Sequence, residues 1–140
     1  IFNKWSGKNG IEEYIKFRTG CKPYSGSGIN YRSNTKTCIL KSVDNTYFYK
    51  DDLNDINNIK YTLFGHNGDQ NENEPKFNEP LLNKNKTEHI YLYRVFLQNN
   101  IKLYIWYGEY HIIEKNILEH IGKDKNLRNI IVLTLKKIIQ

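Results

Sequence analysis

The residues best suited to chemistry in this sequence are two tyrosines and an aspartate near position 50. Tyr49 begins the run Tyr-Lys-Asp-Asp at 49–52, and Tyr61-Thr62 begins twelve positions after it. Two aromatic side chains can hold a flat ring between their faces, because stacking is favourable between π-systems. Asp52, three residues beyond Tyr49, supplies a carboxylate that accepts a hydrogen bond from the edge of such a ring. The spacing therefore predicts a pocket for a flat heteroaromatic group.

Short strands and turns are expected to position these residues. Residues 37–43 follow the alternating pattern of a strand. A turn is expected at 44–45, and the aromatic and β-branched residues 46–49 predict a returning strand. This hairpin would end at Tyr49. Residues 50–60 are polar and predict a loop, which leads into a strand at 60–64.

The N-terminal segment and the middle of the chain add helix and loop. Residues 1–20 predict a helix, or a strand followed by a helix, with apolar side chains at helical spacing and Gly20 at the end. Loops are expected at 23–28 and at 70–85, because glycine, proline and polar residues dominate there. A short helical turn is expected at 78–82.

The C-terminal half has the clearest strand patterns. Residues 117–122 predict a helical turn or an irregular connection, and residues 99–100 predict a tight turn. The last predicted strand is β-branched and has the composition of a strand buried on both faces. Strands are predicted at 29–32, 90–97, 103–106, 108–113 and 128–139. The fold class is therefore α+β and mainly β: a curved sheet or small β-barrel with a few flanking helices.

Size and charge restrict the kind of partner. The chain has 140 residues, which suits one domain, 1–140, and it carries a formal charge of +6. A basic balance favours a polyanion, although a slightly basic soluble protein has the same composition. No apolar run reaches the roughly 20 residues of a membrane span, and no signal peptide is visible, so no membrane partner is expected.

The residues that bind metals in proteins are sparse. Cys21 and Cys38 are the only cysteines and form no Cys-x-x-Cys pair, so two buried thiols are expected, with a disulfide as the alternative. The four histidines are scattered, and no metal site and no cofactor are predicted.

Several short motifs, in consistent order from about residue 32 to the C-terminus, resemble the SET-and-RING-associated (SRA, or YDG) domain. This domain is a β-barrel of the PUA-like superfamily that binds DNA containing modified cytosine. The motifs are Tyr-Lys-Asp-Asp at 49–52, Tyr-Thr-Leu-Phe-Gly-His-Asn-Gly-Asp at 61–69, Asn-Glu-Pro-Leu at 78–81, Ile-Tyr-Leu-Tyr-Arg-Val at 90–95, Trp-Tyr-Gly-Glu-Tyr at 106–110, and a closing strand at 132–137.

The resemblance implies a role for each pocket residue. Tyr49 and Tyr61 would stack on a cytosine that has been flipped out of double-stranded DNA, Asp52 would bond the edge of that base, and Thr62 would line the same pocket. It also implies a binding module without catalytic residues of its own, excised from a longer protein with a fused or associated effector domain. We expect it in the nucleus of a eukaryote, or in the cytoplasm for a prokaryotic or viral protein.

The sequence departs from the family pattern in three places. Leu63 replaces the first glycine of the second motif, and Tyr107 replaces the acid of the Tyr-Asp-Gly signature. The loop after Asp69 is acidic, whereas eukaryotic members carry basic residues there that contact the partner strand. The modification itself, which is 5-methylcytosine, 5-hydroxymethylcytosine or another modified base, is left open.

Residues outside the pocket are assigned to DNA contacts or to turns. Asp51 is expected to be solvated or to cap a loop, and Asp69 is expected to bond backbone amides in a turn. The remaining candidates have a solvated surface as the alternative. DNA-binding loops are predicted to contain Arg32, Ser33, Asn34, Lys36, Gly65, His66 and Asn67, and phosphate contacts Lys123, Lys125 and Arg128.

Three functions are therefore compared. The first is a module that binds modified cytosine, either in a chromatin protein or as the recognition domain of a modification-dependent restriction endonuclease with its nuclease elsewhere. The second is an enzyme, which the absence of a metal-ligand or nuclease motif in the sequence disfavours. The third is an RNA-binding or protein-binding module of the PUA-like superfamily.

Overall fold

The computed structural model describes residues 4–23 and 28–139, which form one seven-stranded sheet and two helices. The predicted loop at 23–28 falls largely outside the described residues. In chain order the elements are β1 (Lys4–Trp5), α1 (Lys8–Thr19), β2 (Ile29–Arg32), β3 (Thr37–Val43), β4 (Asn58–Thr62), α2 (Asn78–Leu82), β5 (His89–Gln98), β6 (Ile101–Ile121) and β7 (Leu127–Lys137). The predicted fold class, mainly β with flanking helices, is confirmed.

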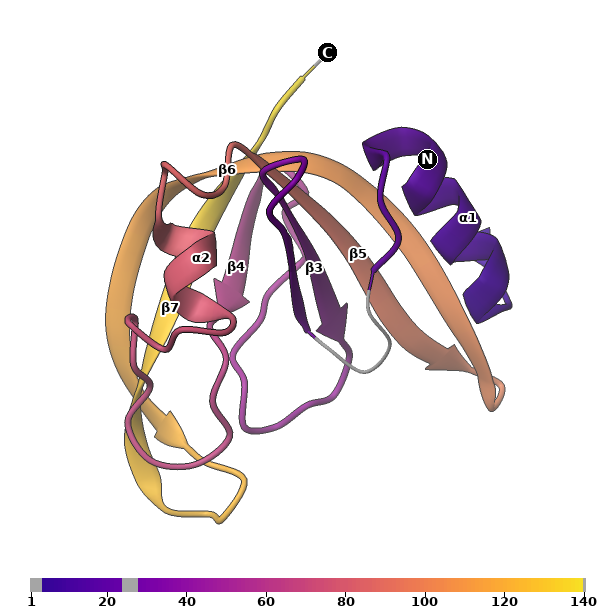
Figure 1. The fold of residues 1–140 in the computed structure, drawn as a ribbon. Coiled ribbons are helices and arrows are strands. Elements are labelled where there is room, and N and C mark those ends of the chain that lie inside the picture. Colours follow the sequence, from indigo (N-terminus) through magenta and orange to yellow (C-terminus); the bar gives the residue numbers. More distant parts are fainter. Residues whose placement is uncertain (1–3, 24–27, 140) are drawn as a thin grey trace.

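The sheet is strongly curved because one strand belongs to two parts of it. The strand order is β2-β3-β5-β6-β7-β4, with β1 added on β6, and only the β3–β5 pair is parallel. The first half of β6 pairs with β5, and the second half pairs with β7. As Figure 1 shows, β6 sweeps around the molecule to make this change of partner, and β4 is carried back toward β3.

A glycine marks the point where β6 changes partner. In the register of β5 with β6, Leu92 faces Gly108 and Tyr93 faces Trp106, so Tyr107 is an extra, bulged residue. Gly108 has φ 103°, a backbone conformation that disfavours any side chain. The glycine of the Trp-Tyr-Gly-Glu-Tyr motif is therefore a requirement of the bend in β6.

The two faces of the sheet bury separate apolar clusters. The inner face, closed by α2, buries residues from six strands, among them Leu40, Leu92 and Leu133. The outer face of β3, β5 and β6 is covered by α1, whose Ile11 and Ile15 are fully buried against it. Helix α1 ends at Gly20 in the left-handed conformation, as predicted.

Two predicted elements were wrong. Residues 46–49 form turns and not a returning strand, because the neighbour of β3 in the sheet is β5, paired in parallel. Residues 117–121 continue β6 and are not a helical turn, because β7 pairs with them residue by residue. Both errors come from long-range pairing that local sequence patterns do not report.

The predicted pair of buried thiols is confirmed, since Cys21 and Cys38 are both buried and free. Neither helix of the described chain is long and apolar enough to cross a bilayer.

Candidate functional site

An aromatic cavity of about 310 Å³ opens at the end of the sheet where β2 begins and β3 ends. Backbone and side chains from β2, β3, β4 and the loops around them form its wall. The aromatic part of the lining comes from Phe48, Tyr49, Tyr61, Phe64, His66 and Phe77. The structure therefore brings Tyr49, Tyr61 and Thr62, predicted to share a pocket, into the wall of one cavity.

Tyr61 has a structural role in addition to its place in this wall. Its side chain is only 4% exposed and packs in the inner core. Its hydroxyl donates to the carbonyls of Gly28 (2.9 Å) and Lys41 (3.3 Å), which joins β4 to the β2–β3 pair where no strand pairing exists. Burial raises the pKa of this phenol well above its ordinary value.

Tyr49 is half-buried and stands in a group of rings. Its hydroxyl accepts a hydrogen bond of 3.4 Å from the amide of Gly65, and its ring lies 4.9 Å from Phe48 and 6.0 Å from His66 between centroids. His66 also contacts Phe48 and Phe64, at 5.1 and 5.6 Å. Burial and the positive charges of Lys123 and Arg128 lower the pKa of His66, which favours a neutral ring at the cavity.

The carboxylate in the cavity wall belongs to Asp51, which was expected to be solvated or to cap a loop. This residue is partly buried, and its two carboxylate oxygens accept hydrogen bonds of 2.7 Å from the Ser42 hydroxyl and the Thr62 amide. Burial raises the pKa of Asp51, and the Ser42 and Thr62 hydrogen bonds oppose that increase. Thr62 in turn accepts the Lys50 amide at 2.8 Å through its own hydroxyl, so residues 50 and 51 are both fixed on β4.

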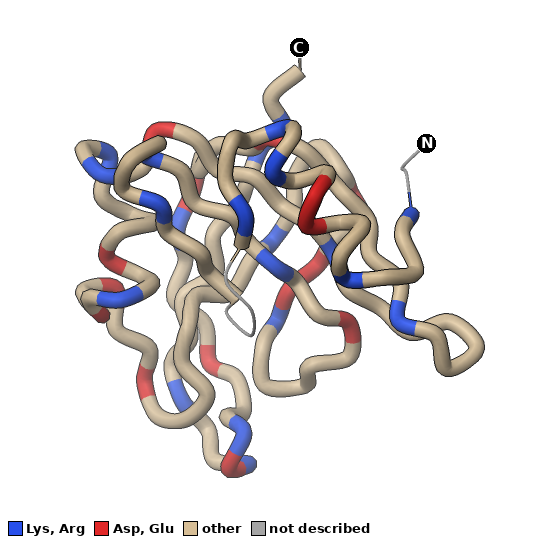
Figure 2. Tube along the Cα trace, turned by 45° about the vertical axis from the view of Figure 1, so that its right-hand side comes forward, with Lys and Arg blue, Asp and Glu red and all other residues tan. Residues whose placement is uncertain are grey.

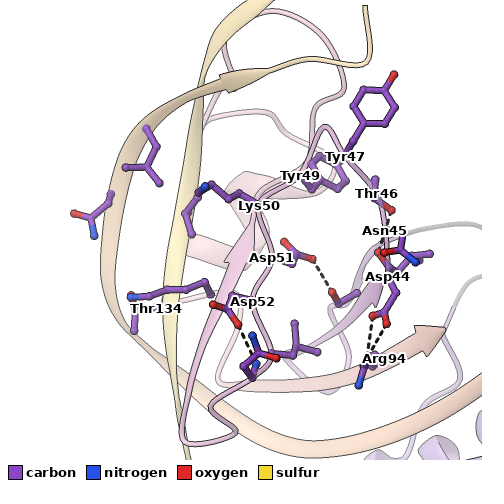
Figure 3. A pocket seen from close by; sticks show the side chains of 18 residues that line it. Asp44, Asn45, Thr46, Tyr47, Tyr49, Lys50, Asp51, Asp52, Arg94 and Thr134 are labelled. Atoms are coloured by element: carbon purple, nitrogen blue, oxygen red, sulfur yellow. Dashed lines mark hydrogen bonds and ion pairs between the residues drawn. The ribbon is translucent and has the colours of Figure 1, made fainter. Parts of the chain in front are cut away.

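Asp52, predicted to bond the edge of a base in this pocket, lies outside the cavity lining. Its backbone pairs with Lys60, and its side chain is exposed and accepts the Asn54 amide at 3.0 Å. Figure 3 shows Asp51 directed toward β3 and Asp52 on the other side of the chain. Successive residues of an extended segment point in opposite directions, which explains why one aspartate enters the wall and the next does not.

A larger groove of about 910 Å³ lies on the other side of the 49–52 segment. The loop at 44–54 and the strands β4, β6 and β7 line it with mostly polar side chains (Figure 3). At one end, Arg94 donates to both oxygens of Asp44, at 2.8 and 2.6 Å. Groove and cavity share the residues Val43, Thr46, Tyr49 and Asp51.

Two of the predicted DNA-contact groups meet beside the cavity. The carbonyl of His66 accepts the Lys123 amide at 2.8 Å, and the side chain of Asn67 accepts the Asp124 amide at 2.8 Å. The exposed Lys123 lies over the Phe48 ring, and Lys125 lies 4.1 Å from the ring centre of Tyr47. The turn after β6 is therefore joined to the Gly65–Gly68 turn, with Lys123 next to the cavity residue Phe48 and Lys125 next to Tyr47.

Arg128 was predicted to contact phosphate, and the structure contradicts this. Its side chain is 4% exposed and donates to the backbone carbonyls of Phe48 and Gly65. The guanidinium therefore holds two loops of the cavity together and is not available at the surface. In the view of Figure 2, lysines and arginines are interleaved with acids along the trace.

The β2–β3 turn, with Ser33, Asn34 and Lys36, is separated from the cavity by the length of β3. The cavity lies at the Lys41–Val43 end of β3, whereas this turn precedes Thr37 at the other end (Figure 1). Seven strand residues span ~20 Å. Arg32 closes β2 at the same remote end and donates to the carbonyl of Lys22. The prediction that this turn enters DNA next to the pocket does not agree with its position.

The acidic loop after Asp69 uses its charges internally. Glu72 pairs with Lys115 at 2.6 Å, and Glu74 accepts the amides of Lys76, Phe77 and Asn78 at the start of α2. Asp69 accepts the Asn129 amide at 2.8 Å, in agreement with its predicted role of bonding backbone amides.

Two side chains that hold the Leu63–Gly65 segment of the cavity were not among the predicted site residues. Asn78, fully buried, bonds both the amide and the carbonyl of Phe64, and Gln70 donates to the carbonyls of Leu63 and Gly65. The only available signal was the position of Asn78 at the start of its motif. Among the described residues, no group of three His, Cys, Asp or Glu side chains is arranged to hold a metal ion.

Comparisons with known proteins agree with this geometry at the level of the fold. No model of a protein family matches the chain, and no curated protein does. Solved structures match well. The first is the sulfur-binding and SRA domains of ScoMcrA complexed with phosphorothioated DNA, with TM-score 0.69 and 15% identity over 100% of this chain and 40% of that one.

Two further matches are the complex of the SUVH5 SRA domain with methylated CHH DNA and the modification-dependent restriction endonuclease TagI. SUVH5 has TM-score 0.60 and 21% identity over 91% of this chain and 84% of its own. TagI has TM-score 0.62 and 14% identity over 92% of this chain and 47% of its own. The chain spans less than half of the ScoMcrA and TagI structures, and it has the fold of SRA domains.

Proposed function

We propose that this chain binds double-stranded DNA containing a modified cytosine and holds that base, flipped out of the duplex, in the aromatic cavity. The observation that carries the proposal is the position of Asp51, a partly buried carboxylate in the wall of a cavity lined by aromatic rings. Solved structures of the same fold are described as complexes with phosphorothioated or methylated DNA, which supports DNA as the partner.

Asp51 provides the discrimination between bases. An ionised carboxylate accepts a hydrogen bond from the exocyclic amine of cytosine, whereas the carbonyl of thymine at the same place is repelled. Each oxygen of Asp51 already has one protein donor, Ser42 or Thr62, and a carboxylate oxygen has lone pairs for a second donor. These two donors fix the orientation of the carboxylate before the base arrives.

The aromatic residues offset the cost of flipping. Extruding a base costs a few kcal/mol, and stacking on an aromatic side chain returns roughly 1–3 kcal/mol per base. Tyr49 is half-buried and held at its hydroxyl by Gly65, so its ring can stack without first being ordered. Lys123 and Lys125, beside the cavity, contact the phosphates that flank the flipped nucleotide.

The setting of this module is the recognition domain of a larger protein, such as a modification-dependent restriction endonuclease with its nuclease in another domain. The match to TagI, of which the chain spans 47%, favours this setting. An RNA-binding PUA-like module is the alternative function, and a matched RNA duplex used as a competitor separates the two.

The test is binding to duplexes that differ only in one base, carrying cytosine, 5-methylcytosine or 5-hydroxymethylcytosine. We expect tighter binding to a modified duplex, and a loss of roughly tenfold or more of that preference in Asp51→Asn. Asp52→Asn is the matched control, because Asp52 lies outside the cavity, and it should keep the preference. Equal affinity for all three duplexes, unchanged by Asp51→Asn, would remove the proposal.

A further inference from the structure

The second half of β6 has an edge on which no described strand pairs. Strand β5 pairs with β6 only as far as Tyr110, and β7 pairs on the opposite edge from Tyr110 to Ile121. Apart from the pairing with β7, no backbone–backbone hydrogen bond of the described chain involves residues 112–121. A bulge at Ile113 interrupts the register with β7, so the regular stretch of this edge runs from Glu114 to Ile121. In Figure 1 this part of β6 forms the left margin of the molecule, with β7 on its inner side.

This segment is exposed on both of its faces as well as along its edge. Every residue from 113 to 119 is exposed, whereas residues 104–107 of the same strand are buried. Large apolar side chains are among the exposed ones, namely Ile113, Leu118 and Ile117, of which Ile117 is 66% exposed. An open strand edge with exposed apolar side chains is a template for pairing with another strand.

The charges along this edge match a second copy of the same strand. When two identical strands pair antiparallel about a two-fold axis, one residue faces its own copy, and residues equally distant from it face each other. With Ile117 on the axis, Lys115 lies opposite Glu119 of the second copy. Glu114 then lies opposite His120. Each contact occurs twice, around a central pair of β-branched side chains, so the strand is complementary to itself.

The neighbouring registers lack this match. With Asn116 on the axis, Lys115 faces Ile117. With Leu118 on the axis, Ile117 faces Glu119. An axis at Lys115 or at Glu119 places two like charges directly opposite each other, which destabilises a strand pair. Among these registers, only the one centred on Ile117 combines an apolar centre with opposite charges on both sides.

Two of these side chains already have a partner within the chain, and both have the capacity for another. The Nζ atom of Lys115 lies 2.6 Å from Glu72, in an exposed ion pair, and an ammonium group has three donors. The Nε2 atom of His120 bonds the Tyr47 carbonyl at 2.7 Å, and Nδ1 is a second polar atom of the same ring. Pairs across the edge therefore add to the existing contacts and do not replace them.

We propose that two copies of this chain associate through the free edge of β6, antiparallel, with Ile117 at the two-fold axis. The sheet then continues from one copy into the other by main-chain hydrogen bonds, and the charged pairs fix the register. Each dimer carries two aromatic cavities, because none of the cavity residues belongs to β6. The inference goes beyond the function proposed above and does not depend on it.

Sedimentation equilibrium of the full chain, from low micromolar to submillimolar concentration, should show a monomer–dimer equilibrium. Ile117→Lys places two cations at the axis and should weaken the dimer at least about tenfold. Lys115→Glu and Glu119→Lys each replace two opposite-charge contacts by two like-charge contacts, and each should weaken the dimer by about tenfold. The double variant Lys115→Glu/Glu119→Lys reverses both charges and should restore the wild-type dissociation constant to within about threefold.

Leu97→Lys is the matched control, because Leu97 is 67% exposed, as Ile117 is, but lies on β5 in its hairpin with the first half of β6. It should leave the dissociation constant unchanged. Because the substituted side chains are exposed, far-UV circular dichroism should be the same for all variants. A wild-type chain that stays monomeric at submillimolar concentration would overturn the inference. So would a dimer that Ile117→Lys leaves intact, or single charge reversals that the double variant fails to rescue.

Discussion

The amide of Thr62 on β4 donates a 2.7 Å hydrogen bond to the carboxylate of Asp51, which is partly buried in the cavity wall. A second hydrogen bond joins the same two segments, because the amide of Lys50, the residue before Asp51, donates to the Thr62 hydroxyl. These two contacts determine which of two consecutive aspartates faces the cavity.

The partly buried carboxylate should make stability depend on pH in a defined direction. Burial raises the pKa of Asp51 in the folded state, so Asp51 contributes most stability below the ordinary carboxyl pKa, and this contribution is lost as pH rises through the raised value. Urea unfolding of wild type and Asp51→Asn at a series of pH values should show wild type losing stability relative to the variant as pH rises from about 4. Ser42→Ala removes a hydrogen bond that opposes the increase in the pKa of Asp51. In this variant the loss of stability should therefore continue to higher pH. An opposite slope would contradict the assignment.

Tyr61 should stabilise the fold through its hydroxyl independently of any ligand. Tyr61→Phe removes the hydrogen bonds to the carbonyls of Gly28 and Lys41 and should lower the free energy of unfolding by about 1–2 kcal/mol. Tyr14→Phe is the control, because its hydroxyl accepts a hydrogen bond from the exposed Arg18, and the cost should stay below ~0.5 kcal/mol. Equal stability of Tyr61→Phe and wild type would show that this closure of the sheet is unimportant.

Arg128 should contribute to the stability of the fold, whereas Lys123 should contribute to DNA binding. Arg128→Ala removes a buried guanidinium bonded to two backbone carbonyls and should cost roughly 2–4 kcal/mol of stability. Lys123→Ala should leave stability within about 0.5 kcal/mol but lower the salt dependence of DNA binding by about one phosphate contact. Thermal unfolding and binding titrations over a range of salt concentrations measure the two effects. A stable Arg128→Ala variant with a reduced salt slope would restore the phosphate-contact prediction.

Gly108 should tolerate no side chain. Gly108→Ala imposes a φ of 103° on alanine and places its Cβ 2.6 Å from Lys137 Nζ, so we expect a loss of about 2–3 kcal/mol in denaturant unfolding. Adding Lys137→Ala should recover the share of the lost stability that comes from the contact with Lys137 Nζ. The share that comes from the positive φ should remain. Gly68→Ala is informative as a control, because its φ of 70° is also positive but no atom lies within 4 Å of the added Cβ.

Cys38 should be unreactive while the protein is folded. Burial raises the pKa of its thiol to about 12, and the side chain is fully inaccessible. In a Cys21→Ser variant, the thiol should react with an aromatic disulfide reagent at pH 8 at least about a thousandfold more slowly in buffer than in denaturant, since the thiolate is the reacting species. Fast labelling of native protein would show that this part of the core opens.

Local patterns in the sequence were sufficient for much of the sheet. The predicted strand at 90–97, the tight turn at 99–100 and the buried strand near the C-terminus follow from alternation, from asparagines that accept positive φ, and from a β-branched run. The order of short motifs indicated the fold, and the twelve-residue spacing of Tyr49 and Tyr61 indicated residues that do line one cavity.

The sequence by itself determined that a strand-rich, basic chain carries two tyrosines and an acid in one neighbourhood, because composition and spacing are local properties. Only the tertiary structure decided which acid enters the cavity and which basic residues remain at the surface. Asp51 is selected by hydrogen bonds from β3 and β4, and Arg128 is buried by carbonyls from two distant loops. Such contacts depend on the parallel pairing of β3 with β5 and on the bend in β6, and these bring together residues that no sequence window contains.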